Sequence, residues 1–416
     1  MKRAVITVVG GGAFIPRLCD ALARSVNLPE VELRLSARRE NRLRVIADHS
    51  ARRLSAARPA WTVQAAPTLE RALEGASIVV LLVRVGGLEA RAWDETFPRR
   101  FGLAGDEGLG PGGIANAWRT LPELARIGRI LLQVAPQARV LNLMAPLGVT
   151  TRLLREQGLD AVGLCELPLI TLEAWLANAR ESAAGATWRY GGFNHLGWFW
   201  GVTARGRDIL RRLADAPRSS GPLVPIDRLT LERYGAAPLR YYYEIFDRDA
   251  CRRHGLERSP DRARELMALS ETMVQQFSDQ PGLEIPAPEV RPTPWLDRAV
   301  APIVSALLNG APHAGFANLT NGKNIPELPP ELVVELGATF TSQGACPITP
   351  GPLPARVAQF LGHIADAEAL TFRAAEQRDP ALLAEAIRAL PLPIPEATVQ
   401  ELASLAQRDV GTREQS

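Results

Sequence analysis

The stretch VVGGGAFIPRL near the beginning of the chain constrains the fold most strongly, because it places three glycines between an apolar run and an amphipathic segment. The run AVITVVG predicts a buried strand, and the residues after the glycines predict a helix that ends near Arg24. Glycines in such a turn let the backbone approach a pyrophosphate, whose charge the helix N-terminus stabilises. We therefore assign Gly10, Gly11 and Gly12 to a dinucleotide cofactor; a plain tight turn is the alternative.

Strand and helix patterns alternate after this turn. Further strands are predicted at VELRLS, ASIVVLLV, ARVLNLM and DAVGLC, with helical patterns such as ENRLRVIADHSARRL between them. This alternation is typical of a doubly wound α/β sheet, so residues 1–170 are predicted to form a Rossmann-like domain. Residues 171–416 are predicted to form a mixed, helix-rich α/β domain for substrate, metal and oligomerisation. It begins with a strand–turn–strand pattern at RYGGFNHLGWFWGVTARG and ends with two or three helices over 354–408.

Composition excludes several classes of protein. Hydrophobic residues make up 46% and charged residues 22%, and the four cysteines form no CxxC pair, which favours a globular protein of a reducing compartment. No apolar run approaches the roughly 18–20 residues of a membrane span. The net charge is only +3, with arginines interspersed among acidic residues, so no nucleic-acid-binding stripe is indicated. We expect a cytoplasmic homodimer or homotetramer that binds a small molecule, without membrane or nucleic-acid partners.

The end of the second predicted strand, RLSARREN, lacks the acidic residue that usually holds the ribose hydroxyls of NAD. Ala37 stands there, and no carboxylate follows until Glu40. Arg38 and Arg39 are instead suited to the 2′-phosphate of NADP. Both arginines are equally compatible with solvated side chains that open the next helix, so the cofactor is expected to be NAD or NADP.

Several longer stretches resemble glycoside hydrolase family 4, the NAD- and manganese-dependent glycosidases, and most closely its 6-phospho-β-glucosidases. In chain order these stretches are VVGGGAF, VRVGGLEARAWDETFPRRFGL, GLGPGGIANAWRTLPEL, LNLMAPLGV, VGLCELP, GFNHLGWF, LRYYY and ANLTNGKNIPELPPELVVEL. The resemblance implies a hydrolase that departs from the two-carboxylate glycosidases. In that family, C3 of the sugar is oxidised by the nicotinamide, the C2 proton is removed and the aglycone is eliminated. Water then adds, and the hydride returns.

The resemblance also implies a divalent metal, usually Mn²⁺, which stabilises charge on the sugar oxygens. Cys165 in VGLCELP and His195 in GFNHLGW match the two protein ligands of this metal. A thiolate and an imidazole are reasonable ligands for a borderline ion. For an isolated pair of this kind, the alternative would be a buried thiol and a core histidine. The family's base is a tyrosine, and within the run 241–243 we favour Tyr241, expecting the other two to pack in the core.

Substrate ligands are implied in the same way. Arg91 in LEARAWDE matches an arginine that holds the sugar 6-phosphate, and Arg291 in EVRPTPW is the candidate for a second. The alternative for Arg91 is a helix-surface arginine near Asp94. Asn142 and Asn194 keep family positions, and we assign both to substrate binding.

Some positions depart from the family pattern. Besides Ala37, these are Ala145 before Pro146, Glu166 after the predicted metal cysteine, and Pro238 before the tyrosine run. The departures leave two other functions open: an NAD(P)-dependent dehydrogenase of a sugar or 2-hydroxy acid, and an inactive nucleotide-binding paralogue. Net reduction of the cofactor during turnover would identify the first, and nucleotide binding without turnover the second.

Overall fold

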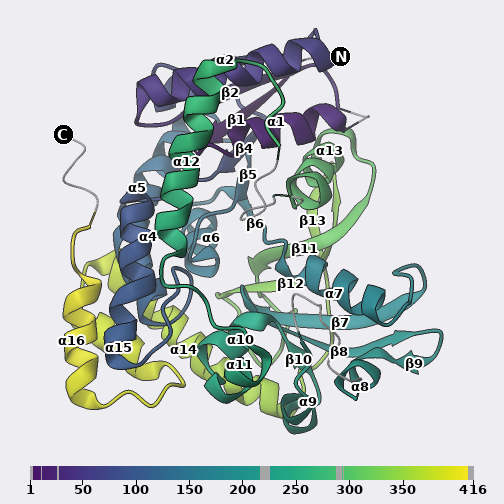
Figure 1. Ribbon diagram of the computed structural model, residues 1–416, viewed down its shortest axis with the longest axis vertical. Helices are drawn as coiled ribbons and strands as arrows, with labels where there is room; N and C mark the ends of the chain where they lie inside the picture. Colours follow the sequence, from purple (N-terminus) through teal and green to yellow (C-terminus); the bar gives the residue numbers. More distant parts are fainter. Residues whose placement is uncertain are drawn as a thin grey trace.

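The structure is a computed structural model that describes residues 3–10, 12–25, 28–215, 225–286, 293 and 295–410. Its described residues include a mixed sheet of 13 strands, with helices on both faces (Figure 1). This arrangement confirms the predicted mixed α/β fold with a doubly wound first half. No helix of the described residues has the length and apolar character needed to cross a membrane.

The first half of the sheet is parallel, with the strand order β3-β2-β1-β4-β5-β6. This is the order of a dinucleotide-binding sheet, in which ligands bind beyond the carboxyl ends of the strands. The central strands β1 and β4 are nearly continuous apolar runs, as expected for strands covered by helices on both faces, whereas β2 and the edge strand β3 contain polar residues. Their bounds are β1 Ala4–Val9, β2 Val31–Ser36, β3 Thr62–Ala65, β4 Ile78–Leu81, β5 Arg139–Asn142 and β6 Asp160–Gly163.

The second half of the sheet is antiparallel and continues from β6 without a break. Strand β11 pairs with β6 through Asn318 and Gly163, and the order then runs β11-β12-β7-β8-β10. The division of the chain at residue 170 stays a prediction, because one sheet passes through both parts. The bounds are β7 Ala186–Phe193, β8 Leu196–Ala204, β9 Arg207–Asp208, β10 Ala237–Pro238, β11 His313–Thr320, β12 Val333–Thr341 and β13 Gly344–Ile348.

Helices cover the parallel half and extend beyond it. Those up to residue 178 are α1 Ile15–Arg24, α2 Glu40–Ala57, α3 Leu69–Leu73, α4 Gly87–Thr96, α5 Gly110–Val134, α6 Leu147–Glu156 and α7 Leu167–Asn178, with a 3-10 helix over Phe97–Phe101. The later helices are α8 Ile209–Ala214, α9 Arg228–Tyr234, α10 Arg240–Ile245, α11 Arg248–His254, α12 Arg262–Asp279, α13 Ala301–Asn309, α14 Ala355–Gln377, α15 Pro380–Ala389 and α16 Glu396–Ala406, with a π-helix over Leu296–Val300.

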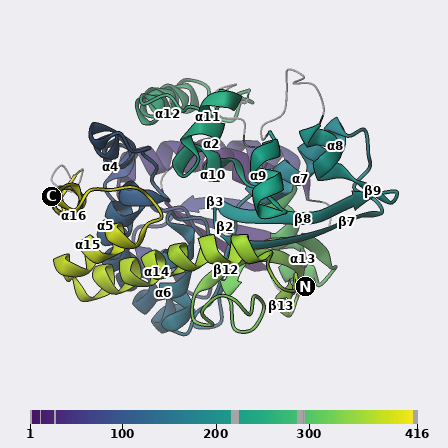
Figure 2. The ribbon, with the colours of Figure 1, turned by 90° about the horizontal axis from the view of Figure 1, so that it is seen from below.

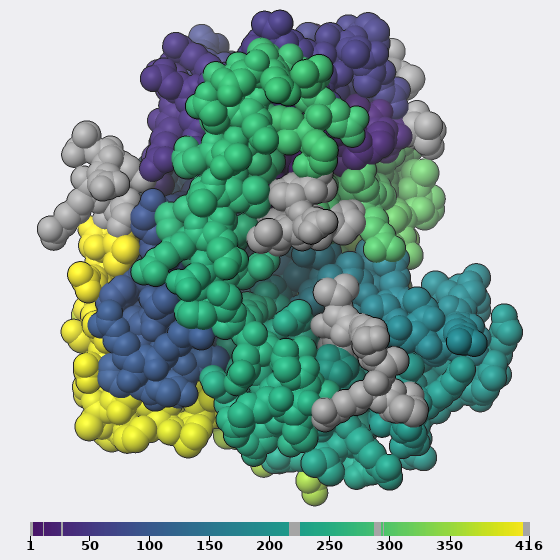
Figure 3. Space-filling model, in the orientation of Figure 1, coloured from purple at the N-terminus to yellow at the C-terminus, as the bar shows by residue number. Residues whose placement is uncertain are grey.

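Helix α12 is the element that joins the two halves above the sheet. It contacts α2 and α4 of the first half, although it belongs to the second. Figure 2 shows α12 and α14 on opposite faces of the sheet. In Figure 3, α12 lies across the N-terminal part of the chain on the face of the molecule toward the viewer. The helix therefore covers the end of the parallel sheet where a nucleotide is expected.

Helix α14 places Glu368 beside Gly148 of α6, at a small cavity of about 40 Å³. Burial raises the pKa of Glu368 to about 8, and Arg152 lowers it in part. Between the ordinary pKa of 4.5 and about 8, the folded state therefore holds a proton that the unfolded chain has released. Since the folded state binds more protons in this window, the free energy of unfolding falls as the pH rises through it.

We expect Glu368→Gln to remove this pH dependence, so that its Tm exceeds that of the native chain more at pH 8 than at pH 5. Scanning calorimetry at the two pH values measures the difference. Glu376→Gln, at an exposed position of the same helix, is the matched control and should change neither value. Parallel pH profiles for the native chain and Glu368→Gln would contradict this account.

Candidate active site

The glycine turn connects β1 to α1 at the carboxyl end of the parallel strands, where a nucleotide is expected. Gly10 has a φ of +134°, and an added Cβ would lie 2.6 Å from the carbonyl oxygen of Leu82. Its amide donates to the carbonyl oxygen of Ser36 at 2.8 Å, which fixes the turn against the end of β2. At Gly12 a Cβ would meet no atom within 4 Å, so the backbone there borders open space. Gly11 lies outside the described residues.

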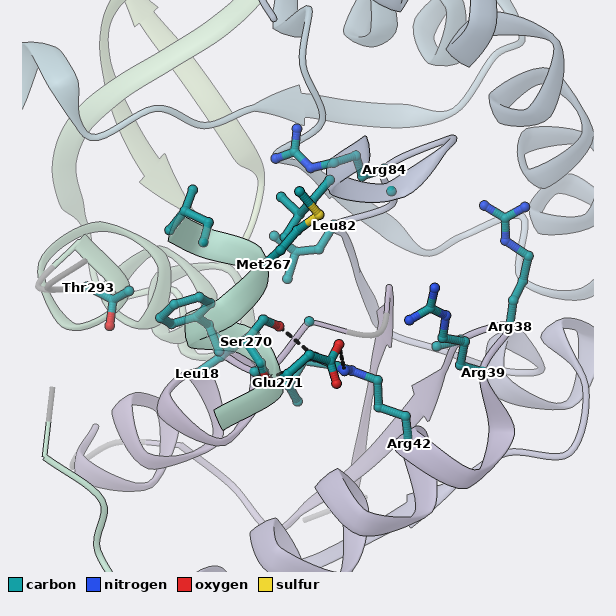
Figure 4. A pocket seen from close by; sticks show the side chains of 18 of the residues that line it. Leu18, Arg38, Arg39, Arg42, Leu82, Arg84, Met267, Ser270, Glu271 and Thr293 are labelled. Carbon is teal, nitrogen blue, oxygen red and sulfur yellow. Dashed lines mark hydrogen bonds and ion pairs between the residues drawn. The ribbon is translucent and has the colours of Figure 1, made fainter. Parts of the chain in front are cut away.

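A cavity of about 320 Å³ opens beyond this turn, between the parallel sheet and α12 (Figure 4). The turn contributes Gly12–Ile15, the end of β2 contributes Ala37–Arg39, and the end of β4 contributes Leu82 and Arg84. Helix α12 supplies the opposite wall with Leu266, Met267, Ser270 and Glu271. The apolar walls, the glycine backbone and the start of α1 together fit a dinucleotide, with its pyrophosphate at the helix N-terminus.

Arg38 and Arg39 both line this cavity, beside Ala37 at the end of β2. Both side chains are exposed, and among the described residues neither has a hydrogen bond or an ion pair. Figure 4 shows Arg39 pointing into the cavity. The role of both arginines as cofactor ligands stays a prediction.

The two predicted metal ligands lie at the junction of the two halves of the sheet. Cys165 follows β6, and His195 lies in the two-residue turn between β7 and β8. Asn194, the other residue of that turn, forms a hydrogen bond with Cys165, which connects the thiol to the turn. His195 has a φ of +66°, an uncommon conformation for a residue other than glycine and one that often marks functional sites.

The chemistry of this pair fits a metal ion. The ring nitrogen Nδ1 of His195 is buried and has no hydrogen-bond partner among the described residues. Burial lowers the pKa of His195 to about 4, so the imidazole is neutral at neutral pH. Burial, with Glu335 and Glu166 nearby, raises the pKa of the Cys165 thiol. A metal must therefore displace a proton from this thiol. No three His, Cys, Asp or Glu side chains gather as a possible metal site in the described part of the chain, and the assignment of Cys165 and His195 as metal ligands stays a prediction.

Tyr241 lies directly against His195. The two rings stack at a centroid distance of 4.0 Å with an interplanar angle of 20°. The guanidinium of Arg258 lies over the Tyr241 ring at 4.0 Å and also forms a hydrogen bond with its side chain. Burial raises the pKa of Tyr241 to about 12, and Arg258 acts in the opposite direction. Arg258 is thus a group of this chain that favours the phenolate.

Arg258 is itself held by carboxylates. Its Nη1 donates to Asp106 Oδ2 at 2.8 Å, and its Nε forms an ion pair with Glu244. The other carboxylate oxygen of Asp106 accepts from the amides of Gly108 and Leu109, at the start of α5. These residues connect the GLGPGG stretch to the tyrosine. Sequence reasoning missed Arg258 and Asp106, since they are far apart in the chain and neither lies in a motif that indicates a partner.

The two tyrosines that follow Tyr241 have different surroundings. Tyr242 and Tyr243 are buried. The hydroxyl of Tyr242 donates to Tyr234, and that of Tyr243 accepts from the amide of Asp227. Both phenols are therefore engaged in packing, and of the three only Tyr241 stacks on His195. The assignment of Tyr241 as the base stays a prediction.

A buried carboxylate, Glu335 of β12, organises the floor of the site. Its Oε1 accepts from Asn194 and Asn318 at 2.9 Å each, and its Oε2 accepts from the hydroxyl of Tyr190. Burial raises the pKa of Glu335 to about 7. Sequence reasoning also missed this residue, although a glutamate inside the apolar run VVELG was a usable signal. Asn194, predicted to bind substrate, here connects Glu335 to the thiol of Cys165.

The remaining predicted substrate ligands are less accessible. Asn142 is fully buried and donates to Thr150 and Thr151. Arg91 is buried as well, with its Nε 2.7 Å from Glu95 and its Nη1 3.1 Å from Glu107. It is therefore not the surface arginine of the alternative interpretation. Arg291 lies outside the described residues. Substrate contacts of all three residues stay predictions.

Comparison with known families identifies the chain. Residues 5–179 match the model of family 4 glycosyl hydrolases, and residues 190–392 match the model of their C-terminal domain. The chain belongs to glycosyl hydrolase family 4. The expected family is thereby confirmed, and with it the expectation of a glycoside hydrolase.

Related proteins span nearly the whole chain. A probable 6-phospho-β-glucosidase of Bacillus subtilis is 27% identical over 416 residues, with 95% of this chain and 93% of the relative covered. The 6-phospho-β-glucosidase of Thermotoga maritima, solved with manganese, NAD⁺ and glucose-6-phosphate, superposes with a TM-score of 0.82 at 21% identity and 97% coverage of each chain. A 6-phospho-α-glucosidase from gut microorganisms, solved with NAD and Mn²⁺, has a TM-score of 0.83 at 20% identity, again covering 97% of each chain. The two structural likenesses show that the same fold spans nearly the whole chain.

Proposed function

We propose that this family 4 enzyme hydrolyses 6-phospho-β-glucosides, using NAD or NADP and a divalent metal such as Mn²⁺, by transient oxidation at C3 of the sugar. The observation that carries the proposal is the stacking of Tyr241 on His195. Removal of the C2 proton and stabilisation of charge on O2 and O3 take place at adjacent carbons, so the base and a metal ligand must be neighbours. The 6-phospho-β-glucosidases of Bacillus subtilis and Thermotoga maritima named above support this substrate class.

The bound cofactor and metal would supply hydride transfer at C3 and a positive charge at the sugar oxygens. The side chains of this protein would remove the proton, stabilise the base and hold the metal. Tyr241 takes the C2 proton, and Arg258 stabilises the negative charge that the phenol must carry to act as a base. Cys165 and His195 would hold the metal, with Asn194 and Glu335 fixing the thiol and the turn. Helix α12 would form one wall around the bound nucleotide, through Leu266 and Met267, and would limit its contact with water.

A panel of nitrophenyl glycosides and their 6-phosphates tests this function. Each substrate is assayed with NAD or NADP, and with Mn²⁺ or with chelator. We expect release of nitrophenol from a 6-phospho-β-glucoside that requires both a nucleotide and the metal, without net accumulation of reduced cofactor. Stoichiometric cofactor reduction would instead indicate a dehydrogenase. Nucleotide binding without turnover of any glycoside would indicate an inactive paralogue. A homodimer or homotetramer stays a prediction, which light scattering can test.

Arg91 is proposed to contact the 6-phosphate, and we expect Arg91→Ala to affect phosphorylated substrates most. The lost charge-assisted contact should raise the Michaelis constant for a 6-phosphoglycoside about tenfold to hundredfold, equivalent to roughly 1.5–3 kcal/mol. The constant for the unphosphorylated analogue should change little. Arg91→Lys keeps the charge but not the two-pronged geometry, so it should have an intermediate effect.

The ion pairs of Arg91 require a stability control. Removing this guanidinium leaves the buried Glu95 without its ion pair and Glu107 with Arg84 as its remaining cation, so Arg91→Ala should also lower the Tm. Kinetics are therefore measured well below the Tm of the variant. If the Michaelis constants for both substrates rise by the same factor, Arg91 supports the fold and does not bind the 6-phosphate.

A further inference from the structure

The part of the nucleotide cavity next to β2 is strongly cationic. Arg38, Arg39 and Arg42 all line it, and the residue that would normally present a carboxylate to the ribose is Ala37. Arg84 also lines the cavity near the end of β4 but forms an ion pair with Glu107, and Glu89 and Glu271 are the acidic groups of the lining. An NAD-selective site would present a carboxylate to the 2′-hydroxyl at this point, and that carboxylate would also repel a 2′-phosphate.

Arg42 differs from the exposed Arg38 and Arg39 because its side chain already has hydrogen-bond and ion-pair partners. Its Nη1 donates to Glu271 Oε1 at 2.5 Å, and its Nη2 donates to the carbonyl oxygen of Ser270 at 3.1 Å (Figure 4). The side chain of Arg42 is 15% exposed, whereas that of Glu271 is 67% exposed. The arginine is thus fixed by its surroundings, while the glutamate has room to turn toward water. A competing anion in the cavity can take the place of Glu271 on Arg42.

We propose that Arg38, Arg39 and Arg42 form a site for the 2′-phosphate of NADP, so that this chain binds NADP in preference to NAD. The inference rests on the function proposed above, in which the cavity holds a nicotinamide cofactor. Arg39 contributes a guanidinium directed into the cavity, and Arg38 contributes a second at its edge. Arg42 contributes a third when the phosphate replaces Glu271 as its ion-pair partner. Guanidinium groups suit a phosphate because their paired N–H groups match its oxygens.

Titration calorimetry of the purified chain with NADP and with NAD, at one ionic strength, is the primary test. We expect the Kd for NADP to be about tenfold to hundredfold lower, as one or two charged hydrogen bonds would give. Adenosine 2′,5′-bisphosphate and 5′-AMP, which lack the nicotinamide, should differ by a similar factor and locate the effect at the adenosine end. Equal or tighter binding of NAD would overturn the inference.

Variants test which residues are responsible for the preference for NADP. The double variant Arg38→Ala/Arg39→Ala should remove most of the preference for NADP, because the affinity for NADP should fall by a much larger factor than the affinity for NAD. Ala37→Asp should reverse the preference, and Glu271→Gln should strengthen NADP binding by freeing Arg42. Arg44→Ala is the matched control, because Arg44 lies on α2 like Arg42, pairs with Glu40 and does not border the cavity. An unchanged NADP affinity in the double variant would overturn the inference.

The inference and the proposed function fail in different ways. Glycoside turnover with NAD, together with tighter NAD binding, leaves the hydrolase function intact and refutes the 2′-phosphate site. If neither nucleotide binds, both proposals are wrong.

Discussion

Replacing Cys165 by serine or His195 by alanine should abolish metal-dependent turnover while the fold survives. Changes in residues that merely support metal ligands cost about 10–100-fold in affinity or activity, so loss of one of only two protein ligands should cost more. Turnover is measured over a series of Mn²⁺ concentrations, and circular dichroism verifies the fold. Cys346→Ser, at an exposed cysteine, is the matched control and should behave like the native chain.

Calorimetry adds a readout that does not depend on activity. Because burial raises the pKa of Cys165, binding of Mn²⁺ should release a proton, which titrations in buffers of different ionisation enthalpy detect. Cys165→Ser should lose this proton release. Native turnover at limiting Mn²⁺ in either the Cys165→Ser or the His195→Ala variant would show that the residue is not a ligand.

Tyr241→Phe should lower kcat by about 10²–10⁴-fold, the usual contribution of a positioned proton-transfer group. Product formed in D₂O by the native chain should carry deuterium at C2, because the proposed reaction removes the C2 proton and later replaces it. The variant should lose this exchange together with turnover. Mass spectrometry of the released sugar phosphate measures the incorporation.

Neighbouring residues provide the controls for Tyr241. Tyr242→Phe removes a phenol that bonds only to Tyr234 among the described residues, so it should lower stability slightly and leave deuterium exchange intact. Arg258→Ala should slow exchange as well, since the phenol loses the cation that favours its charged form. Full exchange in Tyr241→Phe would show that another group is the base.

The elements of the parallel half could be predicted from sequence because each is a local pattern. The apolar runs of β1, β2 and β4 and the amphipathic repeat of α2 agree with the structure, as do the hairpin of β7 and β8 and the helices at the end of the chain. Strand β3, TVQA, was not predicted, because it is short, partly polar and exposed on alternate residues. The pairing of β6 with β11 was not predicted either, since side-chain periodicity says nothing about which strand lies next to which.

The candidate site also contains some residues that the sequence indicates and others that it does not. Cys165, His195 and Tyr241 were proposed from short motifs, and the structure brings His195 and Tyr241 together and connects Cys165 to them through Asn194. Arg258 contacts Tyr241 from the segment just after α11, and Asp106 contacts Arg258 from a distant part of the chain, and neither contact follows a spacing typical of one helix or one motif. The partners of Arg91 are partly local: Glu95 is one helical turn away, whereas Glu107 is not.

The pairing of β6 with β11 limits which chimeras can be built between this enzyme and its relatives. A fragment that ends soon after β6 would expose an unpaired strand edge, which tends to pair with other chains. The same fragment would lack α12, and with it the wall of the nucleotide cavity and the partners of Arg42. A chimera that exchanges the cofactor specificity of two family members must therefore transfer α12 and the β11–β12 hairpin along with the N-terminal strands. The predicted nucleotide site therefore depends on residues of α12 as well as on the N-terminal strands.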